Sequence, residues 1–330
     1  MTRCWRNKKI LVTGGFGFIG RNLVARLLEE GAQVTVVDRS QINAAELNHI
    51  ANGSLEVVVA DIRDPKPAEE YVADQDIIFH LAGHSGPVGS LEAPYTDLEV
   101  NCEGTLNILE AVREVNPSLR VVFPSSRLVY GKPKQLPVSE SAVTKPLTIY
   151  GTHKLTAENY LQVYCRNFGV ETVVLRISNP YGPHVPLPHH KYNILNWFID
   201  LAKKEGTLTV FGEGEQLRDY LYIGDLVAAF LAAARLDNLG GEIFNVGGRK
   251  ARPFVEVAKT VVDVVGKGEV KHVPWPDDYK QVETGDWDFD ISKAKNILGW
   301  EPQVTLAEGI EETLRYYKEE HTVLGRLLQL

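Results

Sequence analysis

The sequence predicts an α/β fold built on a doubly wound parallel sheet, with helices covering both faces of the strands. Two observations predict this class. Short runs of almost uninterrupted apolar residues recur along the first half of the chain, and segments with a helical repeat separate them. Strands that are apolar throughout are typical of parallel sheets buried on both faces. Their alternation with helices favours right-handed crossovers into one sheet.

Six apolar runs are expected to form the strands, at Lys9–Gly15, Val34–Asp38, Leu55–Asp61, Ile77–Ala82, Val121–Ser126 and Thr172–Ser178. A helix is expected at Arg21–Gly31, where the closing glycine is a stop signal. A second helix is expected at Asn101–Val115, and its two apolar sides predict burial between neighbours. Glu242–Gly248 is expected to be a late strand.

The alternation ends near Ser178. The next residues, 179–193, are rich in proline and histidine and predict a long loop. We therefore expect two interleaved domains. The larger consists of 1–178, to which 223–252 return, and the smaller α/β C-terminal domain consists of 179–222 and 253–330.

Composition excludes several classes of protein. The 330 residues suit one large or two moderate domains, and 44% apolar content is ordinary for a soluble globular protein. A net charge of -8 argues against a nucleic-acid partner. The three cysteines are unclustered, so neither a disulfide framework nor a zinc site is expected. With no signal peptide and no membrane-length apolar stretch, we expect a cytoplasmic protein without a membrane partner.

A glycine-rich turn, Thr13–Gly20, follows the first strand and opens the first helix. Its glycines at 14, 15, 17 and 20 permit a tight turn and let backbone N–H groups approach a pyrophosphate. The strand and helix around it are the context that this motif requires. The larger domain is therefore expected to be of the Rossmann type and to bind a dinucleotide.

Acidic residues at strand ends indicate which dinucleotide binds. Asp38 closes the second strand, where a carboxylate accepts hydrogen bonds from ribose hydroxyls and repels a 2′-phosphate. This favours NAD over NADP, although the adjacent Arg39 keeps NADP as an alternative. Asp61 ends the third strand and is placed to accept from the adenine amino group.

The candidate catalytic residues are Tyr150, Lys154 and Ser126. Tyr150 and Lys154 stand four residues apart on a segment with helical periodicity, so they share one face. A nearby ammonium is expected to lower the pKa of the phenol, which then serves as a general base. Ser125 and Ser126 end the fifth strand, where a serine hydroxyl is expected to hold the substrate oxygen.

These residues belong to an ordered series of motifs that resembles the extended short-chain dehydrogenase/reductase family, the nucleotide-sugar epimerases and dehydratases. The resemblance covers nearly the whole chain. The motifs are TGGFGFIG, HLAG, NCEGT, SSRLVYG, YGTHK, LRISNPYGP, FGEGEQLRDYLYIGDL, FNVGG and DISKAKNILGWEP.

The resemblance implies roles for individual residues. Tyr150 corresponds to the catalytic base, Lys154 to the lysine that holds the nicotinamide ribose, and Ser126 to the catalytic serine. The implied NAD-binding residues are Gly14, Gly17, Phe18, Ile19, Gly20, Asp38, Arg39, Asp61, Ile62, Leu81, Ala82, Gly83, Asn101, Ser125, Tyr150 and Lys154. The implied contacts to a nucleotide-diphosphate sugar are Ser85, Ser126, Asn179, Asn193 and Arg218. No metal site is expected, and a homodimer is implied.

The resemblance also implies a reaction in which sugar C4 gives a hydride to NAD⁺, forming a 4-keto sugar. Dehydratases of the family carry an Asp-Glu pair where this chain has Arg127 and Leu128, and decarboxylases carry a Glu at the second position. Return of the hydride to the opposite face, which is 4-epimerisation, is the simplest remaining outcome. The alternatives are a 4-keto-sugar reductase, then a dehydratase or decarboxylase, and a catalytically silent nucleotide sensor.

One position departs from the family pattern. Many family epimerases carry an arginine at the position of Glu283, where it binds the diphosphate of the substrate. A carboxylate does not replace that contact. Arg249 and Arg252 are the alternatives that the sequence offers for this role.

Overall fold

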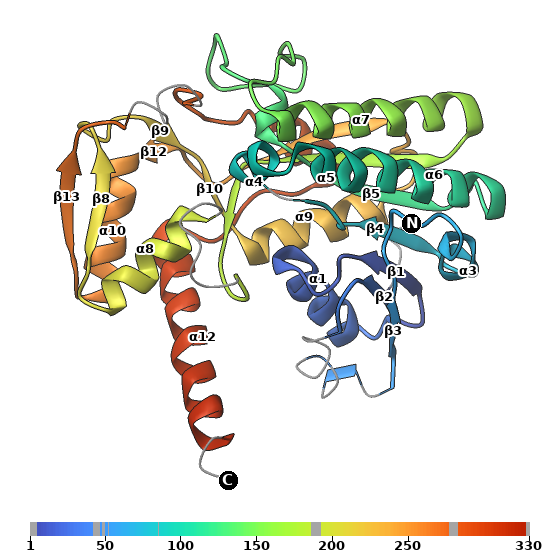
Figure 1. The fold of residues 1–330 in the computed structure, drawn as a ribbon, viewed down its shortest axis with the longest axis horizontal. Coiled ribbons are helices and arrows are strands. Elements are labelled where there is room, and N and C mark those ends of the chain that lie inside the picture. Colours follow the sequence, from blue (N-terminus) through green and yellow to red (C-terminus); the bar gives the residue numbers. More distant parts are fainter. Residues whose placement is uncertain are drawn as a thin grey trace.

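A seven-stranded parallel sheet forms the centre of the larger lobe (Figure 1). The computed structural model describes residues 5–41, 47, 50–51, 53–84, 86–185, 193–276 and 283–327, and side chains of the last helix up to residue 318. The strand order is β11-β6-β5-β4-β1-β2-β3. The bounds are β1 Lys9–Thr13, β2 Gln33–Asp38, β3 Leu55–Val59, β4 Ile77–His80, β5 Arg120–Ser126, β6 Glu171–Ile177 and β11 Glu242–Val246.

Successive residues of each strand enter two different cores, which explains the continuous apolar runs. On β1, Ile10 and Val12 pack into one core, whereas Leu11 packs into the core on the opposite face. On β5, Val122 enters the first core, and its neighbours Val121 and Phe123 enter the second. Because side chains alternate across a sheet, a strand covered on both sides has no polar face.

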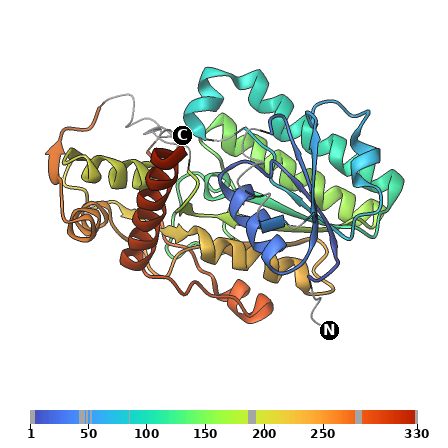
Figure 2. The same ribbon diagram turned by 90° about the horizontal axis from the view of Figure 1, so that it is seen from below.

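Helices cover both faces of this sheet (Figure 2). α1 and α9 cover one face, and α3, α6 and α7 cover the other. The bounds are α1 Phe18–Glu29, α3 Ala68–Val72, α6 Gly104–Val115, α7 Ile149–Phe168 and α9 Ile223–Arg235. Shorter elements lie between them, at α4 Pro87–Glu92, α5 Pro94–Leu98, the π-helix η1 Glu99–Glu103 and the 3₁₀ turn η2 Arg127–Val129.

A smaller lobe is built around the parallel pair β8 Thr207–Phe211 and β13 Glu269–Val273. Two further pairs, β7–β10 and β9–β12, connect it to the larger lobe, and α12 extends away from both lobes in Figure 1. The remaining bounds are β7 Asn179–Tyr181, α8 Ile194–Lys203, β9 Leu217–Arg218, β10 Tyr220–Tyr222, β12 Arg252–Pro253, α10 Phe254–Val265, η3 Ala294–Leu298 and α12 Leu306–Leu327.

The predicted fold class is confirmed, and the late strand joins the large sheet as β11 beside β6. The segment 179–193 is not a loop throughout, because it begins with β7, which pairs with β10. Residues 186–192 lie outside the described part of the chain. The division into 1–178 with 223–252, and 179–222 with 253–330, stays a proposal. Across the described ranges, no helix is both long and apolar enough to span a bilayer.

His80 at the end of β4 links folding stability to pH. Its ring is 1% exposed and lies 2.8 Å from the Thr13 hydroxyl and 3.2 Å from that of Thr105. Burial, aided by Lys154, lowers its pKa from 6.5 to about 3. The unfolded chain therefore binds a proton below pH 6.5 that the folded chain does not.

We expect this difference to remove about 1.4 kcal/mol of stability per pH unit as pH falls from 6.5 towards 3. Chemical denaturation at pH 7 and pH 5 measures it. His80→Gln retains hydrogen bonding without titrating, so the variant should lose less stability over the same interval. Equal losses in the two proteins would contradict the assignment.

Candidate active site

The turn between β1 and α1 forms a cradle with no room for side chains. A Cβ atom at Gly20 would lie 2.3 Å from the Gly14 carbonyl oxygen, so the turn closes only with glycine there. The Gly17 N–H donates to the same carbonyl at 3.1 Å, and α1 begins at the next residue. Backbone N–H groups at a helix start are suited to an anion such as a pyrophosphate.

A cavity of about 280 Å³ opens beside this cradle, at the carboxyl ends of β1, β2, β3 and β4. The structure brings together there nine of the predicted NAD-binding residues, namely Gly14, Gly17, Asp38, Arg39, Asp61, Ile62, Leu81, Ala82 and Gly83. The Asp38 carboxylate accepts hydrogen bonds from the Phe16 and Ser40 N–H groups, at 3.1 and 3.3 Å. It is thus fixed at the rim of the cavity.

Asp61 lines the cavity, but the protein already engages its carboxylate. Arg63 donates to both oxygens at distances between 2.7 and 3.1 Å, and these bonds lower the pKa of Asp61. Arg63 also donates to Glu99 at 2.9 Å. An adenine contact through Asp61 therefore has to share lone pairs with Arg63.

Asn101 supplies an independent test of whether these residues fit NAD. It lies on η1, and its amide nitrogen donates to the His84 carbonyl at 3.0 Å. Its carbonyl oxygen is buried, has no hydrogen-bond partner among the described residues, and faces Gly83 of the cavity, 2.9 Å from where a Cβ would stand. A buried acceptor without a partner is costly, and a bound ligand relieves that cost. Cradle, Asp38 and Asn101 together fit a dinucleotide.

The candidate base lies at the first turn of α7. Thr148 caps this helix by accepting from the Gly151 N–H at 3.0 Å, and Ser90 accepts from the Tyr150 N–H at 3.1 Å. A Cβ at Gly151 would lie 2.6 Å from the Leu128 carbonyl oxygen. This close approach packs the start of α7 against η2, which directly follows Ser126.

Lys154 lies one turn further along α7, and its side chain is buried. Its ammonium is 4.3 Å from the centre of the Phe123 ring and 6.0 Å from that of Tyr150. Burial lowers the pKa of Lys154 to about 8. The ammonium form still predominates at pH 7.

The predicted lowering of the Tyr150 pKa is wrong for the protein chain alone. Burial raises the pKa of Tyr150, and the nearby Asp97 carboxylate raises it further. The sequence argument counted the ammonium of Lys154 but not the desolvation of the phenol, which dominates here. A positively charged ligand group is therefore needed to favour the phenolate.

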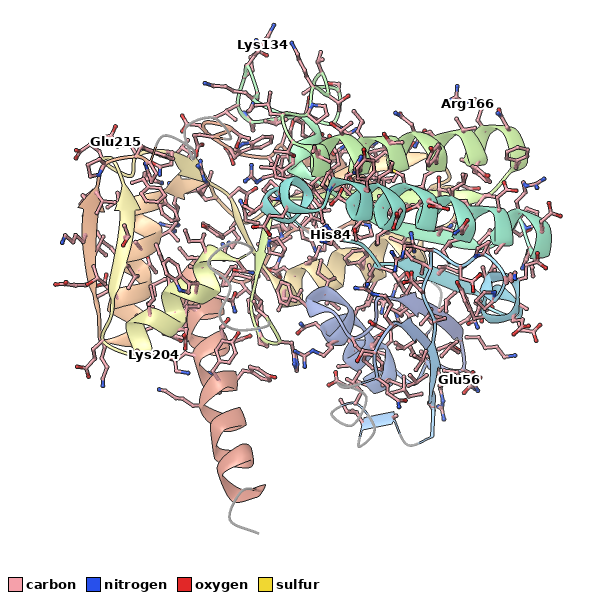
Figure 3. The ribbon with its side chains drawn as sticks, viewed as in Figure 1. Glu56, His84, Lys134, Arg166, Lys204 and Glu215 are labelled. Atoms are coloured by element: carbon pink, nitrogen blue, oxygen red, sulfur yellow. The ribbon has the colours of Figure 1, made fainter. Side chains whose placement is uncertain are left out.

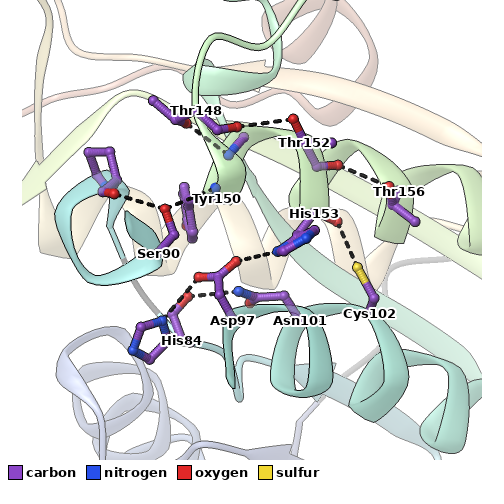
Figure 4. Close-up of polar contacts among 12 residues, drawn as sticks. His84, Ser90, Asp97, Asn101, Cys102, Thr148, Tyr150, Thr152, His153 and Thr156 are labelled. Carbon is purple, nitrogen blue, oxygen red and sulfur yellow. Dashed lines mark hydrogen bonds and ion pairs between the residues drawn. The ribbon is translucent and has the colours of Figure 1, made fainter. Parts of the chain in front are cut away.

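Asp97 is fully buried between two histidines (Figure 4). Its oxygens lie 2.6 Å from His153 Nδ1 and 3.0 Å from His84 Nδ1. His153 precedes Lys154 on α7, and His84 follows β4 near the cavity. This triad ties the Tyr150 helix to the cofactor side of the site, and no sequence motif pointed to it.

The two serines at the end of β5 have different surroundings. Ser125 donates its hydroxyl hydrogen bond to the buried Glu158, so that side chain points away from the cavity. Ser126 accepts from the Leu128 N–H at 3.2 Å and begins η2. Ser126 thus caps η2, the turn against which the start of α7 packs.

The predicted substrate residues gather at the junction of the two lobes. Arg218 lines a second cavity, of about 310 Å³, together with Tyr220, Arg249, Lys250 and Arg252. Asn179 begins β7 close to this cavity, and its amide nitrogen donates to the Asp219 carbonyl at 2.7 Å. Asn193 caps α8 and donates to the Pro180 carbonyl at 2.8 Å.

One predicted site residue is not described by the structure, and several residues of the site were not predicted from the sequence. Ser85, a predicted substrate contact, lies outside the described residues. Sequence reasoning missed Phe16 and Ser40, which line the NAD cavity beside predicted residues. Arg127 was considered only because it replaces the acidic residue of the dehydratases. Its position directly after Ser126 already indicated that it lies near the site.

Fold and site together define a dinucleotide-dependent enzyme, and the ammonium of Lys154 lies near Gly83 of the cofactor cavity. The profile described as NAD dependent epimerase/dehydratase family matches residues 10–247. The chain belongs to that family, within the extended short-chain dehydrogenases/reductases, and its cofactor is NAD.

Individual relatives agree with this assignment. A putative UDP-glucose 4-epimerase of Methanocaldococcus jannaschii is 35% identical over 94% of this chain and 99% of its own. UDP-glucuronic acid decarboxylase 1 of Xenopus tropicalis is 33% identical over 95% of this chain and 73% of its own. The structure of UDP-glucose 4-epimerase from Thermotoga maritima with UDP-glucose has a TM-score of 0.84 and 30% identity, covering 95% of this chain and 99% of that one.

The lowered pKa of Lys154 predicts a pH dependence of cofactor affinity. The ammonium is lost as pH rises through about 8, and a neutral amine makes a weaker hydrogen bond to a ribose hydroxyl. We expect NAD affinity to fall by about fivefold between pH 7 and pH 9. Titration of the cofactor-free protein with NAD measures this. Lys154→Met cannot titrate and should give a flat profile; a flat wild-type profile would refute the link.

Proposed function

We propose that the protein is an NAD-dependent nucleotide-sugar 4-epimerase. The observation that carries the proposal is that the candidate base, Tyr150, is present, whereas the positions after Ser126 hold no acidic residue. Tyr150 lies in the first turn of α7, which packs against η2, and Arg127 and Leu128 of η2 directly follow Ser126. NAD, when bound, would supply the acceptor and donor for the hydride of sugar C4. Tyr150 takes and returns the proton of the C4 hydroxyl, and Ser126 holds that oxygen.

The state of the neighbouring carboxylates supports epimerisation over elimination or decarboxylation. Asp97 and Glu158 both act electrostatically on Lys154. Both histidines engage Asp97, and Arg176 engages Glu158 through two hydrogen bonds to one oxygen, at 2.6 and 3.2 Å. Neither carboxylate is available as the proton donor that loss of water from a 4-keto sugar requires.

The test is an incubation of purified protein with a panel of UDP- and dTDP-sugars and no added cofactor, followed by NMR. A 4-epimerase interconverts the axial and equatorial 4-hydroxyl forms of at least one member with its resident NAD. Turnover of a 4-keto sugar that requires added NAD(P)H would instead establish the reductase. A member that loses water or CO₂ would establish the dehydratase or the decarboxylase.

We further propose a homodimer that pairs through α6 and α7 with the adjoining α4 and α5. Exposed apolar side chains on α4, α5 and α7 support this, because monomers seldom leave such groups in water. They are Leu91, Tyr95, Leu98, Val163 and Phe168, exposed by 56, 79, 44, 41 and 44%. Light scattering should give about twice the chain mass of 36.7 kDa, and Leu98→Glu should shift it towards the monomer.

A further inference from the structure

Arg127 projects from the turn that follows Ser126 towards the junction of the two lobes. Its Nε donates to the Asn179 side-chain oxygen at 3.1 Å, and its Nη1 donates to the Thr284 hydroxyl at 3.2 Å. The guanidinium also lies over the Trp287 ring, 5.0 Å from its centre. Three separate segments therefore hold this cation in one orientation, directly beside the candidate catalytic serine.

The guanidinium of Arg127 keeps one nitrogen without a hydrogen-bond partner in the described part of the chain. No described carboxylate forms an ion pair with it, and its Nη2 has no hydrogen-bond partner among the described residues. Burial and the nearby Arg218 lower the pKa of Arg127 to about 10, although the carboxylates of Glu283 and Asp219 act in the opposite direction. A fixed, partly buried guanidinium with a free donor is suited to an oxyanion.

Both terminal nitrogens of Arg218, the residue expected to bind the diphosphate, are by contrast engaged within the protein. Its Nη2 donates to both oxygens of Glu283, at 2.7 and 2.9 Å. Its Nη1 donates to the carbonyls of Leu217 and Gly285, at 2.9 and 2.8 Å. Glu283 thus neutralises Arg218, whereas no described carboxylate forms an ion pair with Arg127.

Asn179 has a similar supporting role. Its oxygen accepts from Arg127, and its nitrogen donates to the Asp219 carbonyl at 2.7 Å. Both ends of the amide are used within the protein, and its orientation fixes that of Arg127. The predicted substrate contacts Asn179 and Arg218 therefore frame Arg127 from two sides.

We propose that Arg127 binds an oxyanion of the nucleotide sugar and thereby determines which substrates the site accepts. The proposal rests on the proposed function for the class of ligand. The shared chemistry is a negatively charged oxygen pair, which the diphosphate bridge or a carboxylate on the sugar supplies. Both fit the planar fork of a guanidinium.

Calorimetric titration of the NAD-loaded protein with UDP, UDP-glucose and UDP-glucuronic acid tests the proposal. Arg127→Gln should weaken binding by roughly ten- to hundredfold, because a charge-assisted hydrogen bond is lost. If the diphosphate is the oxyanion, all three ligands lose affinity by the same factor. If a sugar carboxylate is the oxyanion, only UDP-glucuronic acid loses affinity. Either pattern supports the proposal.

Two further variants make the test decisive. Arg166→Gln removes the same charge from the exposed far end of α7 and should leave every affinity unchanged (Figure 3). Arg127→Lys keeps the charge and should stay within about tenfold of wild type. The melting temperatures of Arg127→Lys and Arg127→Gln, compared with that of the wild type, show whether a loss of affinity comes from a loss of folding.

The proposal fails if Arg127→Gln changes no affinity by more than twofold. It also fails if Arg127→Lys loses as much as Arg127→Gln, or if the wild-type protein binds none of the three ligands. Binding is measured without turnover, so a protein that binds these nucleotides but epimerises nothing would refute the proposed function and leave Arg127 assigned.

Discussion

Replacing Tyr150 with phenylalanine should lower kcat by about 10²–10⁴-fold, the range typical of losing a general base. The Tyr150 hydroxyl forms no hydrogen bond with the described part of the protein, so its removal breaks no contact within the fold. The variant should therefore keep its NAD and its melting temperature. Initial rates by NMR, together with the dinucleotide released on denaturation, measure both effects.

Two outcomes of the Tyr150→Phe experiment would contradict the role of Tyr150 as the base. A Tyr150→Phe protein that turns over normally would exclude the phenol as the base. A variant that loses NAD or melts earlier would indicate a structural role for the hydroxyl. Thr152→Val on the same helix is a matched control for losing one hydroxyl. That hydroxyl only donates back to the Thr148 carbonyl at 3.0 Å, so its kcat should stay near wild type.

The raised pKa of Tyr150 explains why the base requires its cofactor. Burial disfavours the phenolate, and Asp97 adds a negative charge on the same side of α7. Lys154 stands 6.0 Å from the ring centre and does not overcome this in the chain alone. A bound NAD⁺ would supply the positive charge that favours the phenolate, through its nicotinamide ring. Proton transfer to Tyr150 is then favoured only when the hydride acceptor is also present.

The sequence predicted the large sheet and the NAD cavity well for the same physical reason. Residues such as Val12 and Leu11 enter different cores, so each buried strand reads as one apolar run. In a parallel sheet the carboxyl ends of the strands meet at one edge. Residues that end strands, such as Asp38 and Asp61, therefore line one cavity, and their grouping can be predicted from the sequence alone.

The pairing of distant side chains was not predictable in this way. Glu283 looked like the loss of a diphosphate contact, and only the structure pairs it with Arg218, 65 residues earlier. The His84–Asp97–His153 triad joins three segments that share no motif. Such contacts depend on loop paths and rotamers, which local patterns of polarity do not specify. The burial of a side chain depends on the same tertiary contacts. The sequence therefore did not predict the desolvation of Tyr150, and the predicted direction of its pKa shift was wrong.

Removal of the Glu158 carboxylate should destabilise the fold by about 3–5 kcal/mol, because it leaves a buried charge unpaired. Glu158 is 1% exposed and Arg176 4% exposed, and the two are joined by hydrogen bonds at 2.6 and 3.0 Å. Ser125 donates to the same carboxylate. Arg176 also donates to the Tyr130 hydroxyl at 2.8 Å. The pair thus supports the strand end that carries Ser126.

A double variant that removes both charges of the Glu158–Arg176 pair is the control for Glu158→Ala. In the double variant Glu158→Met with Arg176→Met, both charges are replaced by apolar groups of similar length, and no charge is left unpaired. Because a buried ion pair offsets its own desolvation cost only in part, we expect the double variant to be far closer to wild type than Glu158→Ala. Urea denaturation followed by tryptophan fluorescence gives both values. A double variant as unstable as Glu158→Ala would mean that the geometry of the pair, and not the avoidance of a lone buried charge, stabilises this part of the sheet.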